Sequence, residues 1–113
     1  MSTYIRPLKA KKISHYITIR MPLESKVQGS IISFCKRKGF KVVKLISTSK
    51  NGIADLLILT PGKHTIFCEV KKLGKEPDPL QVYRMDELSG YCTGYFYADS
   101  LSMFKDKLLT ISL

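Results

Sequence analysis

The spacing of apolar residues changes from helical to strand-like along this chain. Between residues 22 and 38, apolar side chains recur three and four positions apart, which predicts an amphipathic helix. Pro22 suits the first turn of that helix, and Gly39 suits its C-terminal end. The face expected to be buried consists of Leu23, Val27, Ile31, Phe34 and Cys35.

Apolar and β-branched residues then form three short runs, which predict strands at residues 40–47, 53–59 and 65–71. The Asn51-Gly52 pair between the first two runs is the strongest hairpin-turn signal in the chain. Pro61-Gly62 predicts a second turn. We therefore expect an antiparallel meander of three strands.

The second half of the chain alternates between helical and strand patterns. The expected elements are a polar loop at 72–79, a helix at 80–89, a strand at 95–98, a helix at 100–107 and a last strand at 108–113. The predicted order is α-β-β-β-α-β followed by a terminal extension. This length and pattern suit one α/β domain at residues 22–113, preceded by a basic arm at residues 1–21.

Charge is distributed unevenly over the 113 residues, whose formal net charge is +10. Residues 1–50 hold twelve Lys and Arg but one acid, Glu24, whereas residues 51–113 hold seven bases and eight acids. Such a basic half would attract a nucleic-acid backbone through counterion release, and a solubilising surface or contact with anionic lipid are the alternatives. The acids in the second half favour nucleic acid. The expected DNA-contacting residues are Lys9, Lys11, Lys12, Arg20, Lys26, Lys50, Lys72 and Lys75.

The basic arm at residues 1–21 fits three interpretations. It could be a disordered tail, an arm that contacts nucleic acid, or a strand exchanged with a partner subunit. Its residue pattern leaves all three open.

The cysteines show no metal-binding or disulfide pattern. Cys35, Cys68 and Cys92 are odd in number, lack CxxC spacing and sit in apolar surroundings, so we expect buried free thiols in a reducing cytosol. Zinc is not favoured, because His15 and His64 have no ligand spacing to these thiols. The sequence also has no membrane-span-length apolar run and no signal-peptide pattern, so we expect no membrane association.

Asp55, Glu69 and Lys71 are the strongest candidates for chemistry. Side chains alternate along a strand, so Glu69 and Lys71 share a face, and Asp55 can reach that face across the hairpin. Two carboxylates and an ammonium beside an apolar core are costly unless they bind something, and a divalent cation would offset that cost. The alternative is that Asp55 caps a turn and Glu69 forms a surface ion pair with Lys71 or Lys72.

Three other features have both a functional and a structural interpretation. Glu24 is the only acid near the basic half, but an acid in a first helical turn also favours the helix dipole. Gln81 begins a helix, where any polar residue fits. The aromatic group offers a base-stacking surface or, as we prefer, packing between a helix and a strand. It consists of Tyr91, Tyr95, Phe96 and Tyr97.

One set of segments resembles the virus-type replication-repair nuclease (VRR-NUC) family of the PD-(D/E)xK nuclease superfamily. The segments are Gly52-Ile-Ala-Asp-Leu-Leu, Glu69-Val-Lys, a Gly74-Lys75 loop leading to Gln81, and Gly90 or Gly94. The resemblance covers residues 24–99. Ala54 departs from it, since family members usually have proline there.

The resemblance implies a restriction-endonuclease-like fold, with a mixed sheet flanked by helices. It implies that Asp55, Glu69 and the Val70 carbonyl bind Mg2+ or Mn2+, with Glu24 on a second ion or its water shell. Lys71 would orient the attacking water or stabilise the transition state, and Gln81 would bind the water or the DNA backbone. The implied activity is metal-dependent cleavage of branched DNA, such as four-way (Holliday) junctions, by a homodimer.

Two other functions stay open. The chain could be a basic DNA- or RNA-binding module with a degenerate nuclease core, for which Ala54 gives some support. It could also be a restriction-type enzyme with sequence preference, although its short length and lack of a recognition insert argue against this.

Overall fold

A single four-stranded sheet organises the structure. The computed structural model describes residues 23–111. In chain order, the elements are α2 (Glu24–Arg37), β1 (Lys41–Lys44), β2 (Leu56–Thr60), β3 (His64–Val70), α3 (Pro79–Leu88), the 3-10 turn η2 (Ser89–Tyr91), β4 (Gly94–Ala98) and α4 (Leu101–Leu109). This order confirms the predicted α-β-β-β-α-β arrangement and the α/β class.

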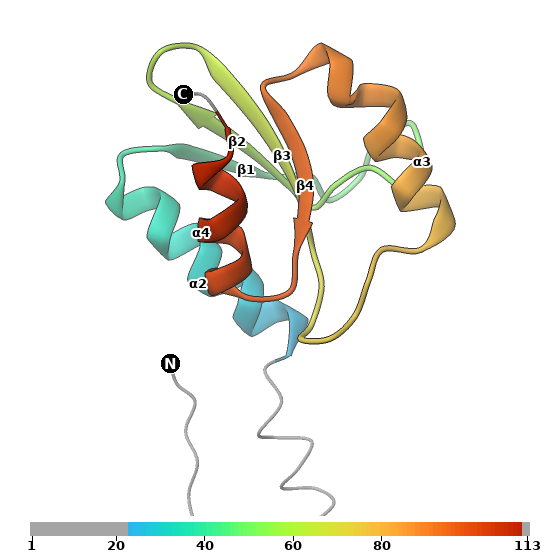
Figure 1. Ribbon diagram of the computed structural model, residues 1–113, viewed down its shortest axis with the longest axis horizontal. Coiled ribbons are helices and arrows are strands. Elements are labelled where there is room, and N and C mark those ends of the chain that lie inside the picture. The colour runs from blue at the N-terminus through green and yellow to red at the C-terminus, as the bar shows by residue number, and fades with distance from the viewer. Residues whose placement is uncertain (1–22, 112–113) are drawn as a thin grey trace, which may run out of the picture.

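The sheet is mixed, as expected, with strand order β1-β2-β3-β4. The first three strands form the predicted antiparallel meander, and β4 runs parallel to β3. A parallel neighbour needs a crossover connection, which the segment containing α3 supplies. Figure 1 shows α2 and α4 close together, with α3 apart from both of them.

The hydrophobic core lies between one face of the sheet and the helices α2 and α4. Alternation along the strands places every second side chain on this face. The buried core residues are Val27, Ile31 and Cys35 of α2, Leu56 and Ile58 of β2, Ile66, Cys68 and Val70 of β3, Ala98 of β4 and Phe104 of α4. Residues 55 and 69 alternate with these core residues along the chain. They therefore lie on the other face of the sheet, which α2 and α4 do not cover.

The connection between β1 and β2 is longer than the predicted hairpin. β1 ends at Lys44 and β2 begins at Leu56, and one further backbone hydrogen bond, from Leu45 N to Asp55 O (2.8 Å), extends their pairing. Gly52 has the positive φ (+81°) of a turn residue, but a Cβ there would lie 2.8 Å from Leu80 Cγ of α3. The Asn51-Gly52 turn therefore packs against α3 instead of closing a two-residue hairpin.

The prediction of a last strand at residues 108–113 is wrong for residues 108–111, the part of this range that the structure describes. α4 continues to Leu109, followed by a turn at Thr110. Leu101, Phe104 and Leu108 contact the core at helical spacing, which favours helix over strand here. Residues 112–113, like residues 1–22, lie outside the description, so the interpretations of the N-terminal arm stay untested.

Two of the three thiols are buried, as predicted. Cys35 and Cys68 are fully buried and Cys92 is half-buried, and none of the three forms a disulfide. Burial raises the pKa of the Cys35 thiol to about 11, which keeps this sulfur protonated at neutral pH. Among residues 23–111, no helix is both long and apolar enough to cross a membrane.

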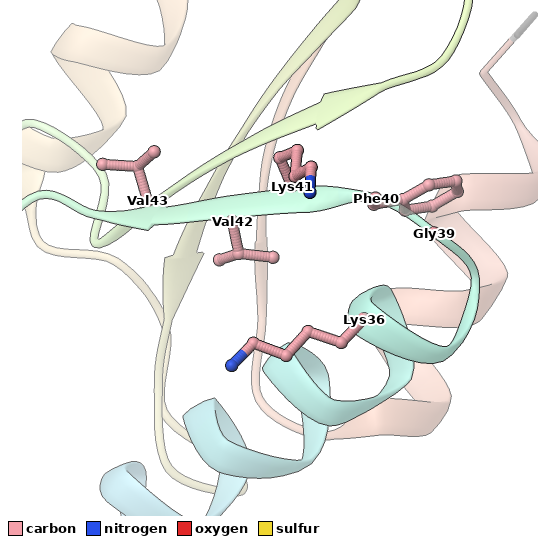
Figure 2. A pocket seen from close by; sticks show the side chains of 6 residues that line it. All are labelled: Lys36, Gly39, Phe40, Lys41, Val42 and Val43. Atoms are coloured by element: carbon pink, nitrogen blue, oxygen red, sulfur yellow. The ribbon is translucent and has the colours of Figure 1, made fainter.

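A shallow hollow lies where α2 ends and the edge strand β1 begins. It is lined by Lys36, Gly39, Phe40, Lys41, Val42 and Val43. Figure 2 shows Val42 directed toward α2 and Val43 directed away from it, which is the alternation expected of a strand. None of the candidate catalytic residues lines this hollow, so they lie elsewhere in the fold.

Candidate active site

Asp55 directly precedes β2 and lies next to Glu69 of the neighbouring strand β3. The last pair of the β2–β3 register is Leu56 with Cys68, and the residues that follow it on the two sides are Asp55 and Glu69. Directly opposed residues share a face and have Cβ atoms about 5 Å apart. The Asp55 carboxylate is close enough for its negative charge to help raise the pKa of Glu69. The structure therefore brings together the two carboxyls that the sequence pattern paired.

Backbone contacts hold Asp55 on both sides. Its carboxylate oxygen Oδ2 accepts a hydrogen bond of 2.7 Å from the amide of Val70, and its carbonyl accepts the one from Leu45. A backbone amide as donor fixes the carboxylate to a rigid strand instead of to a mobile side chain. Among the described residues, no hydrogen bond to the second oxygen, Oδ1, accompanies this contact.

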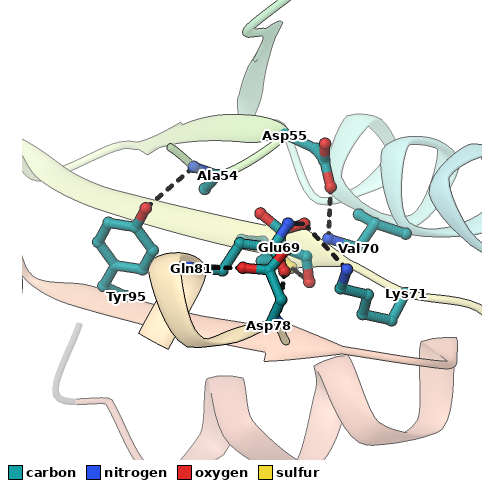
Figure 3. Close-up of polar contacts among 9 residues, drawn as sticks. Ala54, Asp55, Glu69, Val70, Lys71, Asp78, Gln81 and Tyr95 are labelled. Carbon is teal, nitrogen blue, oxygen red and sulfur yellow. Dashed lines mark hydrogen bonds and ion pairs between the residues drawn. The ribbon is translucent and has the colours of Figure 1, made fainter. Parts of the chain in front are cut away.

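Glu69 is a buried acid with an unusual proton affinity. The residue is 3% exposed, and Figure 3 shows its side chain between Asp55, Lys71 and Gln81. Burial, reinforced by the negative charge of Asp55, raises the pKa of Glu69 to about 8, although Lys71 opposes the shift. At neutral pH without metal, Glu69 therefore keeps its proton, which avoids repulsion between its carboxylate and that of Asp55.

Lys71 places its ammonium at the open side of this pair. Its Nζ lies 3.9 Å from Glu69 Oε2, and its side chain is 17% exposed. The backbone amide of Lys71 donates to the carbonyl of Ala98 (2.9 Å), so the residue after β3 is still tied to β4. The ammonium is thus both near the acids and accessible to a ligand from solvent.

Gln81 connects α3 to Glu69. Its Nε2 donates to Glu69 Oε2 at 2.8 Å, while its Oε1 accepts from the amide of Asp78 at 2.9 Å. The amide of Gln81 donates in turn to Asp78 Oδ1, which completes a capping box at the start of α3. Since both ends of its amide group are engaged, Gln81 orients Glu69.

Glu24 stands apart from the two paired acids. It is the exposed first residue of α2, and among residues 23–111 no three acids, histidines or cysteines lie close enough to share an ion. Its charge is still near enough to raise the pKa of Glu69 slightly. The structure thus brings together two of the three predicted acids, with Glu24 at the margin.

Comparison with known proteins agrees with this geometry. No family model matches the chain. A curated protein called "Putative nuclease p44", from Acyrthosiphon pisum secondary endosymbiont phage 1, is 28% identical over 64 residues, or 57% of this chain and 69% of that protein. A solved structure described as a VRR_NUC domain is 30% identical, with a TM-score of 0.67 over 77% of this chain and 94% of that one. The chain belongs to the VRR-NUC family.

The basic residues expected at the nucleic-acid surface of this VRR-NUC domain fall into two groups. Lys9, Lys11, Lys12 and Arg20 lie outside the described residues. Lys26, Lys50, Lys72 and Lys75 are all exposed, and Lys50 forms an ion pair of 3.8 Å with Glu87. The loop that carries Lys72 and Lys75 is anchored by the buried Asp99, which accepts from the amide of Gly74 at 3.0 Å.

Sequence reasoning missed two residues that support the candidate site. Asp78 has a recognisable signal, because an acid three residues before Gln81 is the pattern of a capping box. Tyr95 was assigned to packing, but its hydroxyl accepts a hydrogen bond of 2.9 Å from the amide of Ala54. No local pattern reveals that contact, since the two residues are 41 positions apart.

Proposed function

We propose that this chain is a metal-dependent DNA endonuclease that hydrolyses phosphodiester bonds in branched DNA. The observation that carries the proposal is the pairing of Asp55 with the buried Glu69, with the Lys71 ammonium 3.9 Å from Glu69. Family membership and the relative described as a nuclease support hydrolysis of nucleic acid.

The acid pair fits a hard divalent cation. One oxygen of each carboxyl is already bonded, Asp55 Oδ2 by the Val70 amide and Glu69 Oε2 by Gln81, which leaves Asp55 Oδ1 and Glu69 Oε1 as ligands. Mg2+ and Mn2+ prefer such oxygens, with water completing the coordination. A buried acid that retains a proton to near pH 8 releases it when a cation takes its place. The Val70 carbonyl is the third proposed ligand.

Such a cation lowers the pKa of a bound water and neutralises charge on the phosphate. The protein residues supply position and charge around it. Gln81 keeps Glu69 turned toward Asp55, and the Lys71 ammonium stabilises negative charge on the attacked phosphate or orients the attacking water. Glu24 would act at longer range, on the water shell of a second ion.

The proposed substrate is DNA with a branch. The exposed Lys26, Lys72 and Lys75 offer phosphate contacts near the acid pair, because Lys72 and Lys75 lie one and four residues after Lys71 and Lys26 is on the first turn of α2. The preference for branched DNA is inferred from the family resemblance.

A panel of labelled substrates tests the activity and its selectivity. With Mg2+ or Mn2+, we expect the protein to nick four-way and splayed DNA at least about tenfold faster than single strands or plain duplex, and EDTA to abolish nicking. Binding without nicking under every divalent metal would instead identify a degenerate nucleic-acid-binding module. Equal nicking of all substrates would contradict the preference for branched DNA.

A two-fold homodimer is part of the same proposal. It would present two active sites to two strands, which one domain of 12.8 kDa cannot do alone. We expect sedimentation at micromolar concentration to give twice that mass, in the presence or absence of a four-way junction. A 12.8 kDa species in both conditions would contradict the dimer without affecting the proposed chemistry.

A further inference from the structure

The backbone just before Asp55 is held by a side chain from the opposite side of β3. Tyr95 of β4 accepts a hydrogen bond of 2.9 Å at its hydroxyl from the amide of Ala54, which precedes Asp55. β3 lies between β2 and β4 in the sheet, so the Tyr95 side chain spans a strand to make this contact. Figure 3 shows the bond on the same side of β3 as Glu69.

The tyrosine ring is itself fixed. Tyr95 is the register partner of Phe67 on β3, and the two rings stack with centroids 5.0 Å apart and an interplanar angle of 21°. A stacked pair of this kind restricts rotation of the ring. The hydroxyl therefore sits at a defined point above the entry to β2.

The donor exists because residue 54 is not proline. Ala54 is 1% exposed, and a buried amide without an acceptor is costly. Proline has no N–H and fixes its own φ, so it would shape this backbone without any partner. In this chain, alanine leaves the backbone freer and supplies the donor that Tyr95 engages.

Asp55 needs such a restraint. It ends the long connection between β1 and β2, outside the regular strand, and lies next to Glu69 of β3. The Val70 amide holds the carboxylate of Asp55, and the Tyr95 hydroxyl holds the peptide that precedes it.

We propose that Tyr95 is a positioning residue, which holds the Ala54–Asp55 peptide so that the Asp55 carboxylate stays opposite Glu69 for cation binding. It replaces the conformational restraint that proline would supply at residue 54. This inference rests on the proposed function, because the cation is what the positioned carboxylates bind.

The test compares Tyr95→Phe with Tyr91→Phe. Tyr95→Phe keeps the ring stack and removes only the hydroxyl, whereas Tyr91 is 87% exposed and loses the same atom without consequence. For Tyr95→Phe we expect about 10- to 100-fold weaker Mn2+ binding by calorimetry. We also expect a lower kcat with an unchanged KM for DNA, and faster hydrogen exchange at the Ala54 amide by NMR.

A double-mutant cycle with Ala54→Pro identifies the bond. If the bond acts as proposed, the double variant loses no more Mn2+ affinity than the single Tyr95→Phe variant does. The reason is that proline removes the donor and restores the restraint. Additive losses would overturn the inference, as would wild-type Mn2+ affinity and Ala54 exchange in Tyr95→Phe. If Ala54→Pro does not fold, Tyr95→Phe decides alone. Wild-type protein that neither binds Mn2+ nor nicks DNA would instead refute the proposed function.

Discussion

Replacing Lys71 by alanine is expected to lower the rate of DNA nicking by roughly 100- to 1,000-fold, the loss typical of removing one group that stabilises charge in a transition state. The Lys71 ammonium is 3.9 Å from Glu69 and 17% exposed, so it can contact both the acid pair and an incoming phosphate. Single-turnover nicking of a four-way junction with Mg2+ measures this loss. Because the substitution leaves Asp55 and Glu69 in place, Mn2+ and DNA binding should persist.

Lys72→Ala is the matched control for this experiment. Lys72 is the next residue along the chain and carries the same charge, but it is exposed and forms no ion pair with a described residue. We expect it to weaken DNA binding and reduce its salt dependence, with little change in the single-turnover rate at saturating protein. Equal loss of rate in both variants would show that Lys71 contributes only general attraction, and the chemical role proposed for it would be wrong.

The pairing of Asp55 with Glu69 could be predicted because it depends on local rules. Alternation gives the face of each side chain, and a turn at Pro61-Gly62 brings the two strands together in one register. The observed turn comprises three residues, Pro61, Gly62 and Lys63, between Thr60 and its partner His64. Short-range chemistry therefore specified the centre of the site.

The contacts that support this centre could not be predicted in the same way. Tyr95 meets Ala54 only because β4 pairs with β3 in a parallel register, which follows from how the whole chain packs. The Asn51-Gly52 signal was misinterpreted for the same reason. Its glycine does have a positive φ, but Leu80 and Arg84 of α3 pack on it, and Arg84 Nε donates to the Asn51 carbonyl at 2.7 Å. Packing between distant segments, and not local turn chemistry, decides the path of that loop.

Glu24 shows a further limit of the sequence argument. Its position in the first turn of α2 is compatible with both the helix dipole and the acid pair, and the pattern could not choose between them. In the structure it is exposed and influences Glu69 through its charge alone. The side chains that do reach Glu69 are Lys71, directly after β3, and Gln81 of α3, whose first turn is closed by the capping box at Asp78.

Glu69→Gln is expected to abolish nicking while stabilising the metal-free protein at alkaline pH. The pKa of Glu69 is raised from 4.5 to about 8, chiefly by burial and then by Asp55. Below pH 4.5 the carboxyl is protonated in both the folded and the unfolded chain. Between pH 4.5 and 8 the unfolded chain releases this proton and the folded chain keeps it, so the folded state loses stability as pH rises through that window. Glutamine does not titrate, and the variant escapes this loss.

Thermal unfolding in EDTA at pH 5 and pH 8.5 measures the difference. We expect the free energy of unfolding of Glu69→Gln to exceed that of the wild type by about 2 to 5 kcal/mol at pH 8.5 and by much less at pH 5. The exposed Glu76, changed to glutamine, serves as the control and should follow the wild type at both pH values. A Glu69→Gln variant that gains no stability between pH 5 and pH 8.5 would contradict the electrostatic account of the pair.

Adding Mg2+ should reverse the order of stability. The wild type should gain stability with Mg2+ concentration, because a ligand that binds only the folded state stabilises it by mass action. Glu69→Gln lacks one of the two carboxylates and should gain little. The buried pair therefore destabilises the metal-free fold and binds a cation for the same reason. Two carboxyls are held next to each other in a site that excludes most water.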